Sequence, residues 1–251
     1  MAKILRMAAC LCALMLLPLT ASALSPYTVD EISGEEWYPS KEDWTYHYVY
    51  SCPRIVCGDD DPVGLLINDT LQMALDEMRL LALPMFAESP EMTASGPVTV
   101  TEEGRVMCNN GRFFSVLTVK CEEKGGGKTW SLESDTFDVS GDYPGETLTL
   151  RGVVMVGESS EQISAAVLPV LYGAFEELQS RGVCLPGVAW EEFSQIVIPT
   201  LDFYADENGS AVFYFQPSLL CEPGEDVPVF TFTPAELEAL VGAMPAGEEE
   251  R

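Results

Sequence analysis

Basic side chains and histidine are scarce in this chain. It has 13 Lys and Arg residues against 40 Asp and Glu, one histidine (His47) and a net charge of −27. Nucleic-acid binding needs a basic face that neutralises phosphates, so we exclude nucleic acid as a partner. An acidic protein attracts cations and basic proteins over long distances, although acidity also serves solubility alone.

Familiar catalytic and metal-binding motifs are missing as well. The chain has no C-x-x-C pair, no H-E-x-x-H and no G-x-S-x-G, so neither a zinc site nor a serine-nucleophile elbow is indicated. His47 lies in an aromatic segment, where we interpret it as structural. We therefore predict no catalytic residue, no metal site and no cofactor. A hydrolase that uses two of the many carboxylates stays an alternative.

A single long apolar run is present, and it lies at the N-terminus. Lys3 and Arg6 flank the start of the apolar run 7–19, and the small residues Ala21-Ser22-Ala23 follow it. This is the pattern of a cleaved secretory signal, and about 13 apolar residues are too few to span a bilayer. We predict a signal peptide over residues 1–23 and a secreted or extracytoplasmic protein of the cell envelope. No membrane span is expected after signal removal.

Removal of the signal changes both the charge and the cysteine count. Lys3 and Arg6 leave with it, so the net charge goes from −27 to −29. Six cysteines remain, and an even number in an exported protein indicates disulfides. Spacing alone does not choose the pairing, and we favour the local pairs Cys52–Cys57, Cys108–Cys121 and Cys184–Cys221.

Apolar periodicity predicts the order of elements. Polar residues with Pro and Gly predict a flexible N-terminal segment over 24–43. Alternating runs predict strands over residues 44–50, 97–101, 105–108, 112–121, 129–139, 201–205, 211–215 and 227–232. Helical spacing predicts helices over residues 63–87, 160–179 and 234–242, the last opened by the capping box that begins at Thr233. Residues 147–156 form a further apolar segment.

This order predicts an α+β protein with helices packed on antiparallel meander sheets. Asn109-Asn110-Gly111 and residues 206–210 are hairpin signals, and no βαβ rhythm is evident. We expect two similar halves, over residues 44–145 and 146–242, followed by an acidic tail over 243–251.

The aromatic strands and one acidic loop form the candidate binding surface. Alternating aromatics offer a face to sugar or protein, but they also form half-buried core. The acidic loop supplies oxygen ligands of the kind that calcium accepts, without the spacing of a calcium loop, so we interpret it as a solvated loop. The candidate residues are Tyr46, Tyr48, Tyr204, Tyr214, Asp59, Asp60 and Asp61.

Several segments together resemble a known family. They are Tyr46-His47-Tyr48, Pro53, Asn68, Thr136-Phe137-Asp138, Gly145, Leu148-Thr149-Leu150, Asp202-Phe203-Tyr204, Gly209, Val212-Phe213-Tyr214-Phe215, Phe230-Thr231-Phe232 and Leu237. Over roughly residues 44–241, the chain resembles the extracytoplasmic module of the anti-sigma-V factor of Gram-positive bacteria. The same module accompanies some secreted peptidoglycan deacetylases. The glycine-rich turn Gly125-Gly126-Gly127-Lys128 departs from the family, because many members have a histidine there.

The resemblance implies a binding module at the bacterial envelope and not an enzyme. The anti-sigma member senses lysozyme by binding it, and a basic protein such as lysozyme suits a charge near −29. Sigma-factor control and deacetylation are not expected, because the sequence lacks the parts that perform them. We expect the partner to be lysozyme, another basic protein or a wall component. The alternatives are a cell-wall hydrolase or esterase that uses carboxylates, and a structural envelope module without a specific ligand.

Overall fold

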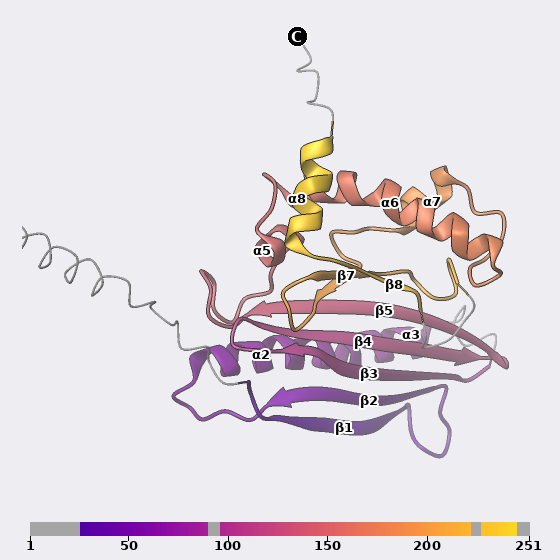
Figure 1. Cartoon of the computed structure of the whole chain (residues 1–251). Helices are drawn as coiled ribbons and strands as arrows, with labels where there is room; N and C mark the ends of the chain where they lie inside the picture. Colours follow the sequence, from indigo (N-terminus) through magenta and orange to yellow (C-terminus); the bar gives the residue numbers. More distant parts are fainter. Residues whose placement is uncertain (1–25, 90–95, 222–226, 245–251) are drawn as a thin grey trace, which may run out of the picture.

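A five-stranded sheet and a smaller three-stranded sheet organise the chain (Figure 1). The structure, a computed structural model, describes residues 26–89, 96–221 and 227–244. The predicted signal peptide and most of the predicted acidic tail lie outside these residues. Within them, no helix is long and apolar enough to cross a membrane. The prediction of an α+β fold is confirmed.

The large sheet contains the first five strands in chain order. They are β1 (Val29–Tyr38), β2 (Tyr46–Ile55), β3 (Val98–Asn109), β4 (Phe113–Lys124) and β5 (Gly127–Asp138). Neighbours are antiparallel except for β2 and β3, which are parallel. The turns between β3, β4 and β5 fall at the predicted Asn-Gly and Gly-rich segments. At the second turn, Gly125 and Gly126 both have positive φ, which glycine adopts without strain.

The flexible segment predicted over residues 24–43 is wrong for most of its length. Residues 29–38 form β1, which pairs with β2 along its whole length. Acidic side chains and Gly34 hide this strand from a pattern search. Gly34 is needed there, because a Cβ atom at this position would lie 2.5 Å from the Tyr50 hydroxyl. Close approach to a neighbouring ring explains this glycine better than chain flexibility does.

A helical crossover joins β2 to β3, so one pair of neighbouring strands departs from the predicted antiparallel meander. The crossover consists of α2 (Pro62–Glu77), the π-helical segment η1 (Met78–Ala82) and α3 (Leu83–Glu88). Parallel neighbours require such a connection. The buried side chains Ile67, Leu71 and Leu75 lie on the face of α2 that packs against the sheet.

The C-terminal unit contains the small sheet and most of the helices. Its helices are α5 (Leu150–Val154), α6 (Ser160–Ser180), α7 (Trp190–Ile196) and α8 (Pro234–Ala243), and its strands are β6 (Phe203–Ala205), β7 (Ala211–Tyr214) and β8 (Val229–Phe232). The capping box at Thr233 and the hairpin at residues 206–210 are confirmed. The apolar segment near residue 150 is helical rather than extended. This unit has its own core, centred on Phe175, Phe193 and Phe215.

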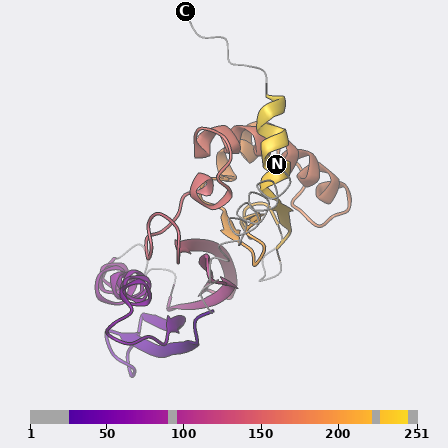
Figure 2. The same cartoon turned by 60° about the vertical axis from the view of Figure 1, so that its left-hand side comes forward.

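The two units pack on each other through one face of the large sheet. Leu117, Val119 and Leu132 of that sheet contact Tyr204 and Tyr214 of the small sheet. Figure 2 shows α2 end-on, on the other side of the large sheet from the C-terminal helices. The units differ in strand number and in strand direction, so the expected similarity of the halves does not extend to topology.

Candidate functional site

A hollow of about 700 Å³ lies between the free edge of β5 and the C-terminal unit. This volume is within the range of ligand-binding pockets. Three segments line the hollow: strand β5 at residues 131–136, the stretch 147–149 that precedes α5, and residues 200–203 with Tyr214 and Gln216. The site therefore exists only because the two units pack together.

Side-chain hydrogen bonds hold the walls of the hollow in place. The Gln216 amide donates to the Leu132 carbonyl (2.9 Å) and accepts from the Leu132 N–H (3.0 Å). It also donates to the Asp202 carboxylate (2.8 Å). The Ser134 hydroxyl bonds to the Phe203 carbonyl and lies 3.0 Å from the Tyr214 hydroxyl. Each of these contacts joins β5 to the C-terminal unit or braces the wall opposite β5.

The charged residues that line the hollow are all acidic. Glu133 and Asp135 alternate along β5, so they project from the same face of the strand. Asp135 pairs with Val116, which packs against α2, so both carboxylates lie on the α2 side of the sheet and border the hollow at the free edge of β5. Asp202 belongs to the C-terminal wall of the hollow and is 7% exposed. No Lys, Arg or His is among the lining residues. An arrangement of carboxylates with hydroxyl and amide groups can accept hydrogen bonds from a cationic group.

The walls shift the pKa values of two of these carboxylates. Desolvation raises the pKa of Asp135, and the neighbouring Glu133 charge raises it further. The side chain of Asp135 is nevertheless exposed to solvent, so it lies in a part of the hollow that water reaches. Desolvation also raises the pKa of Asp202, against the hydrogen bonds from the Ile198 N–H and Gln216.

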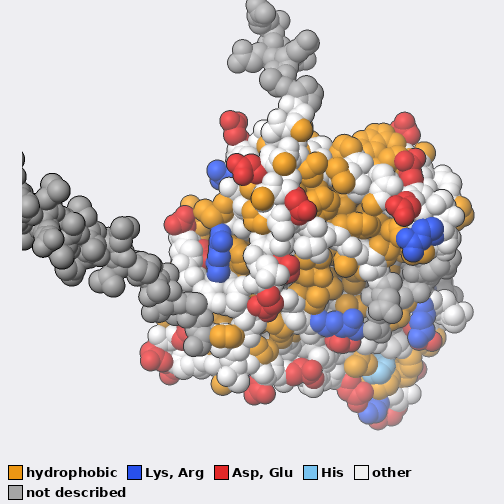
Figure 3. Space-filling model, in the orientation of Figure 1, with side chains coloured by type: hydrophobic (Ala, Val, Ile, Leu, Met, Phe, Trp, Pro, Cys, Tyr) orange, Lys and Arg blue, Asp and Glu red, His pale blue; other side chains and the backbone are white. Residues whose placement is uncertain are grey.

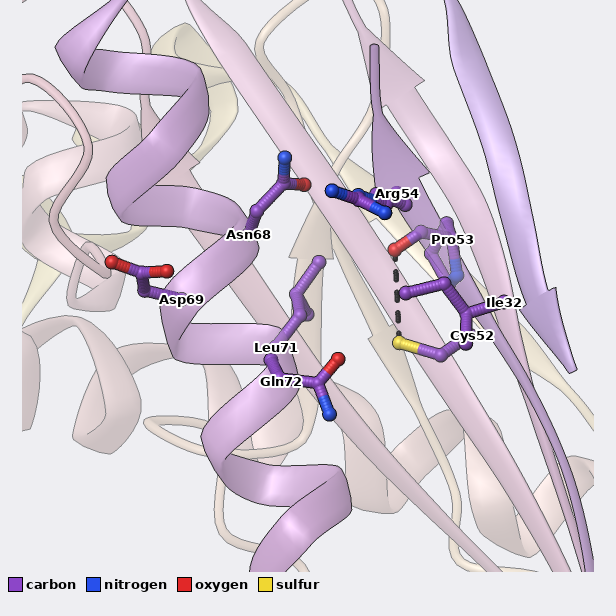
Figure 4. A pocket seen from close by; sticks show the side chains of 8 residues that line it. All are labelled: Ile32, Cys52, Pro53, Arg54, Asn68, Asp69, Leu71 and Gln72. Atoms are coloured by element: carbon purple, nitrogen blue, oxygen red, sulfur yellow. Dashed lines mark hydrogen bonds between the residues drawn. The ribbon is translucent and has the colours of Figure 1, made fainter. Parts of the chain in front are cut away.

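A second, smaller hollow lies between α2 and β2 (Figure 4). Its volume is about 170 Å³, below the usual size of ligand pockets. Asn68 of α2 accepts a hydrogen bond from the Ile55 N–H (2.8 Å) and donates to the Ile55 carbonyl (2.9 Å). Asp69 points away from the strand in this view. The side chain of Asn68 thus links α2 to the C-terminal end of β2 by two hydrogen bonds.

The predicted aromatic binding surface is wrong, because its tyrosines are core residues. Tyr46, Tyr48, Tyr204 and Tyr214 are 3%, 0%, 7% and 1% exposed, respectively. The first two pack between β2 and the crossover helices, and the other two pack between the sheets. Only Tyr214 reaches the large hollow. Alternation predicts which side chains share a face, but not that a helix or a second sheet covers that face.

The acidic loop of the predicted surface does not line the large hollow. Asp59 and Asp60 are exposed, and Asp61 caps α2 by accepting a hydrogen bond from the Gly64 N–H (3.0 Å). Among the described residues, no three His, Cys, Asp or Glu side chains are grouped to hold a metal ion.

One of the three predicted disulfide pairs is placed for bonding. The sulfur atoms of Cys184 and Cys221 are 3.2 Å apart, and both residues are buried. Cys108 lies opposite Ser115, and Cys121 lies opposite Thr101, so these two cysteines are roughly 20 Å apart along the ladder.

The predicted pair of Cys52 and Cys57 is likewise too far apart for a disulfide. Cys52 is followed by three further residues of the extended strand β2, and Cys57 lies beyond the end of that strand. Their Cα atoms are therefore separated by more than the roughly 7 Å that a disulfide allows.

Glu133, Asp135 and Gln216 were not singled out from the sequence. The first two are acidic residues at alternate positions of a predicted strand, which is a common pattern on any solvent-facing strand. Asp202 does belong to one of the segments that carry the family resemblance. Only the packing of the two units reveals that these side chains share a hollow.

Comparison with known proteins extends the description of the fold. No family model matches the chain, and no curated protein matches it in sequence. Two solved structures of DUF3298 family proteins are similar. One, from Bacteroides fragilis, is 12% identical with a TM-score of 0.53 and covers 86% of this chain and 99% of its own. The other, from Pseudomonas aeruginosa, is 13% identical with a TM-score of 0.51 and covers 85% and 93%. At this identity the likeness concerns the fold alone.

Proposed function

We propose that this protein is a secreted, non-enzymatic binding module of the bacterial envelope that recognises a basic protein, with lysozyme as the type of partner. The observation that carries the proposal is the hollow beside β5, in which every charged lining residue is acidic. Export and the envelope location rest on the signal-peptide pattern and on the family resemblance.

The chemistry of the hollow suits a lysine or arginine side chain. Glu133 and Asp135 accept charge-assisted hydrogen bonds at the open side, where both keep contact with solvent. Leu201, which is 64% exposed, and Leu148 give apolar surface along which the stem of a long cationic side chain can pack. The partner's cation would thus meet a complementary wall at both its charged end and its stem.

The charge of the whole molecule supports the same kind of partner. Acidic side chains are spread over the face shown in Figure 3 and do not gather in a single patch. Such a distribution accelerates encounter with any basic protein but does not select a docking position. The hollow supplies the position, because Glu133 and Asp135 stand on a strand of the packed sheet.

The test is calorimetric titration with hen egg-white lysozyme at 150 mM NaCl. The double variant Glu133→Gln/Asp135→Asn should weaken binding by about tenfold or more, which corresponds to about 1.4 kcal/mol. The matched control, Asp59→Asn/Asp60→Asn, removes the same charge from the exposed loop and should change the Kd by less than about twofold. Absence of binding by the unmodified protein, or equal weakening by both doubles, would contradict the proposal.

A second candidate is a wall hydrolase, and one observation favours it. Desolvation and the Glu133 charge raise the pKa of Asp135, and a carboxyl group with a raised pKa is typical of the general acid of a glycosidase. Release of soluble fragments from purified peptidoglycan is the measurement. An enzyme would release fragments, and Asp135→Asn would abolish the release. A protein that neither binds lysozyme nor releases fragments would fit the structural envelope module instead.

A further inference from the structure

The backbone of β5 has a defined outward side. In an antiparallel strand, the N–H and C=O of one residue point to the same side, and successive residues alternate. The N–H groups of Trp130, Leu132 and Asp138 donate to acceptors on the side away from β4. The β4–β5 register is regular from Phe113 to Lys124. The even-numbered residues of β5 therefore direct their backbone groups away from β4, and at Ser134 this side borders the hollow.

Hydrogen bonds occupy the outward groups of Leu132 and the outward carbonyl of Thr136. Gln216 binds both backbone groups of Leu132. The Thr136 carbonyl accepts from the Leu148 N–H (2.6 Å). Within the described ranges, by contrast, no hydrogen bond reaches the outward N–H or C=O of Ser134. The half-buried edge of β5 is thus open at both outward backbone groups of Ser134, and this opening lies in the hollow.

We propose that this open edge at Ser134 binds an extended segment of the basic partner by strand addition, with two backbone hydrogen bonds to Ser134. This inference rests on the proposed function and adds the mode of recognition. Peptides commonly bind sheet edges in this way, and main-chain hydrogen bonds supply affinity while alternate side chains supply specificity. An unpaired edge otherwise invites unspecific pairing.

The geometry also specifies the partner's sequence pattern. Side chains of directly opposite residues lie on the same face of a sheet. The residue paired with Ser134 therefore faces the C-terminal unit, and its two neighbours share the face of Glu133 and Asp135. Basic residues on both sides of one uncharged residue complement these acids. A second copy of this acidic chain is disfavoured as the occupant, because like charges would meet.

The length of the opening limits the occupant to a short segment. Leu132, whose two outward groups are occupied, and Thr136, whose carbonyl is occupied, are four residues apart, or about 13 Å. About three extended residues fit between them. A loop tip of the partner therefore fits better than a long strand.

The first experiment uses the peptide acetyl-Thr-Lys-Val-Lys-Thr-amide and the full chain. N-methylation of the valine amide removes the donor that faces Ser134, and it should weaken binding by about tenfold. N-methylation of the second lysine amide is the matched control, because that group faces away from β5. It should change the Kd by less than about twofold, since charge and length are unchanged. Equal effects of the two methylations would overturn strand addition.

The second experiment measures amide hydrogen exchange with lysozyme bound. Exchange at Ser134 should slow by about tenfold or more, whereas Gly126 at the exposed turn should not change. If lysozyme binding depends on Glu133 and Asp135 but exchange at Ser134 is unchanged, strand addition is wrong and the proposed function stands. If neither lysozyme nor the peptide binds, both proposals fail.

Discussion

At the scale of single residues, polar side chains supply hydrogen bonds to backbone groups that have no neighbouring strand. Asn68 binds both backbone groups of Ile55, and Gln216 does the same for Leu132. Asp138 accepts from the N–H groups of Ser140, Gly141 and Tyr143 and so closes the turn after β5. Buried backbone groups need partners, and these side chains supply them where no neighbouring strand exists. Asn68 and Asp138 belong to the segments that carry the family resemblance, and the hydrogen bonds that they make here are structural.

Replacement of Asn68 by alanine should destabilise the protein by about 2–3 kcal/mol. The change leaves two backbone groups of Ile55 without partners, and the cost of such groups is of this size. Urea unfolding at pH 7 is the measurement. Asp69→Ala, at the exposed neighbouring position, should stay within about 0.5 kcal/mol of the unmodified protein. Equal losses for both variants would show that helix propensity, and not the fastening of β2, is responsible.

The stability difference between the unmodified protein and Asp202→Asn should depend on pH. Desolvation raises the pKa of Asp202 in the folded state, so between the unfolded and folded pKa values the folded state binds more protons. Asp202 therefore contributes most at low pH, and this contribution falls as pH rises from about 4 through the raised value. Urea unfolding of both proteins from pH 4 to 7 should show the unmodified protein losing stability relative to the variant. A constant difference would mean that the hydrogen bonds to Asp202 cancel the desolvation.

At the scale of elements, a glycine within a strand does not always end it. The predicted strands 97–101 and 105–108 are parts of the single strand β3, which runs through Gly104. A Cβ atom at Gly104 would lie 2.5 Å from Cδ of Pro53, so the glycine allows two strands to approach. The sequence pattern shows the glycine but not the neighbour that requires it.

Oxidation should join the loop after α6 to the loop after β7. Cys184 and Cys221 face each other across an antiparallel bridge and are 37 residues apart in the chain. Closing a loop of this length stabilises a fold by roughly 2–4 kcal/mol. The oxidised protein should show four free thiols after signal removal, and reductant should lower its Tm. Cys184→Ala/Cys221→Ala should be insensitive to reductant, and six free thiols in the oxidised protein would contradict the bond.

At the scale of the whole molecule, negative charge acts on folding and on binding in opposite ways. Acidic residues outnumber basic ones by 40 to 13, and their mutual repulsion is strongest in the compact state. The same excess attracts a basic partner. Salt screens both the repulsion within the chain and the attraction to the partner. Added salt should therefore change stability and binding in opposite directions, which separates the two effects.

An increase from 10 to 150 mM NaCl should raise the Tm by a few degrees and weaken lysozyme binding. The Debye length falls from about 30 Å to about 8 Å over this range, which reduces repulsion within the chain and attraction between the proteins. Thermal scanning and calorimetry on the same samples test the two signs. The Glu133→Gln/Asp135→Asn variant should show the same rise in Tm with a smaller salt effect on binding. A Tm that falls with salt would mean that attractive ion pairs outweigh the repulsion.

The sequence by itself determined the class of fold, most helices, the hairpin turns and the sign of the charge. These features depend on local periodicity, on turn and capping residues and on composition, all of which can be seen along the chain. The tertiary structure alone decided that 29–38 is a strand, that β2 and β3 are parallel and that the candidate tyrosines are buried. Of the three predicted cysteine pairs, it selected Cys184 and Cys221 as the pair that meets. It also decided that Glu133, Asp135 and Asp202 share a hollow beside the open edge at Ser134. Contacts between residues far apart in the chain create these features, and periodicity does not encode which surface covers which.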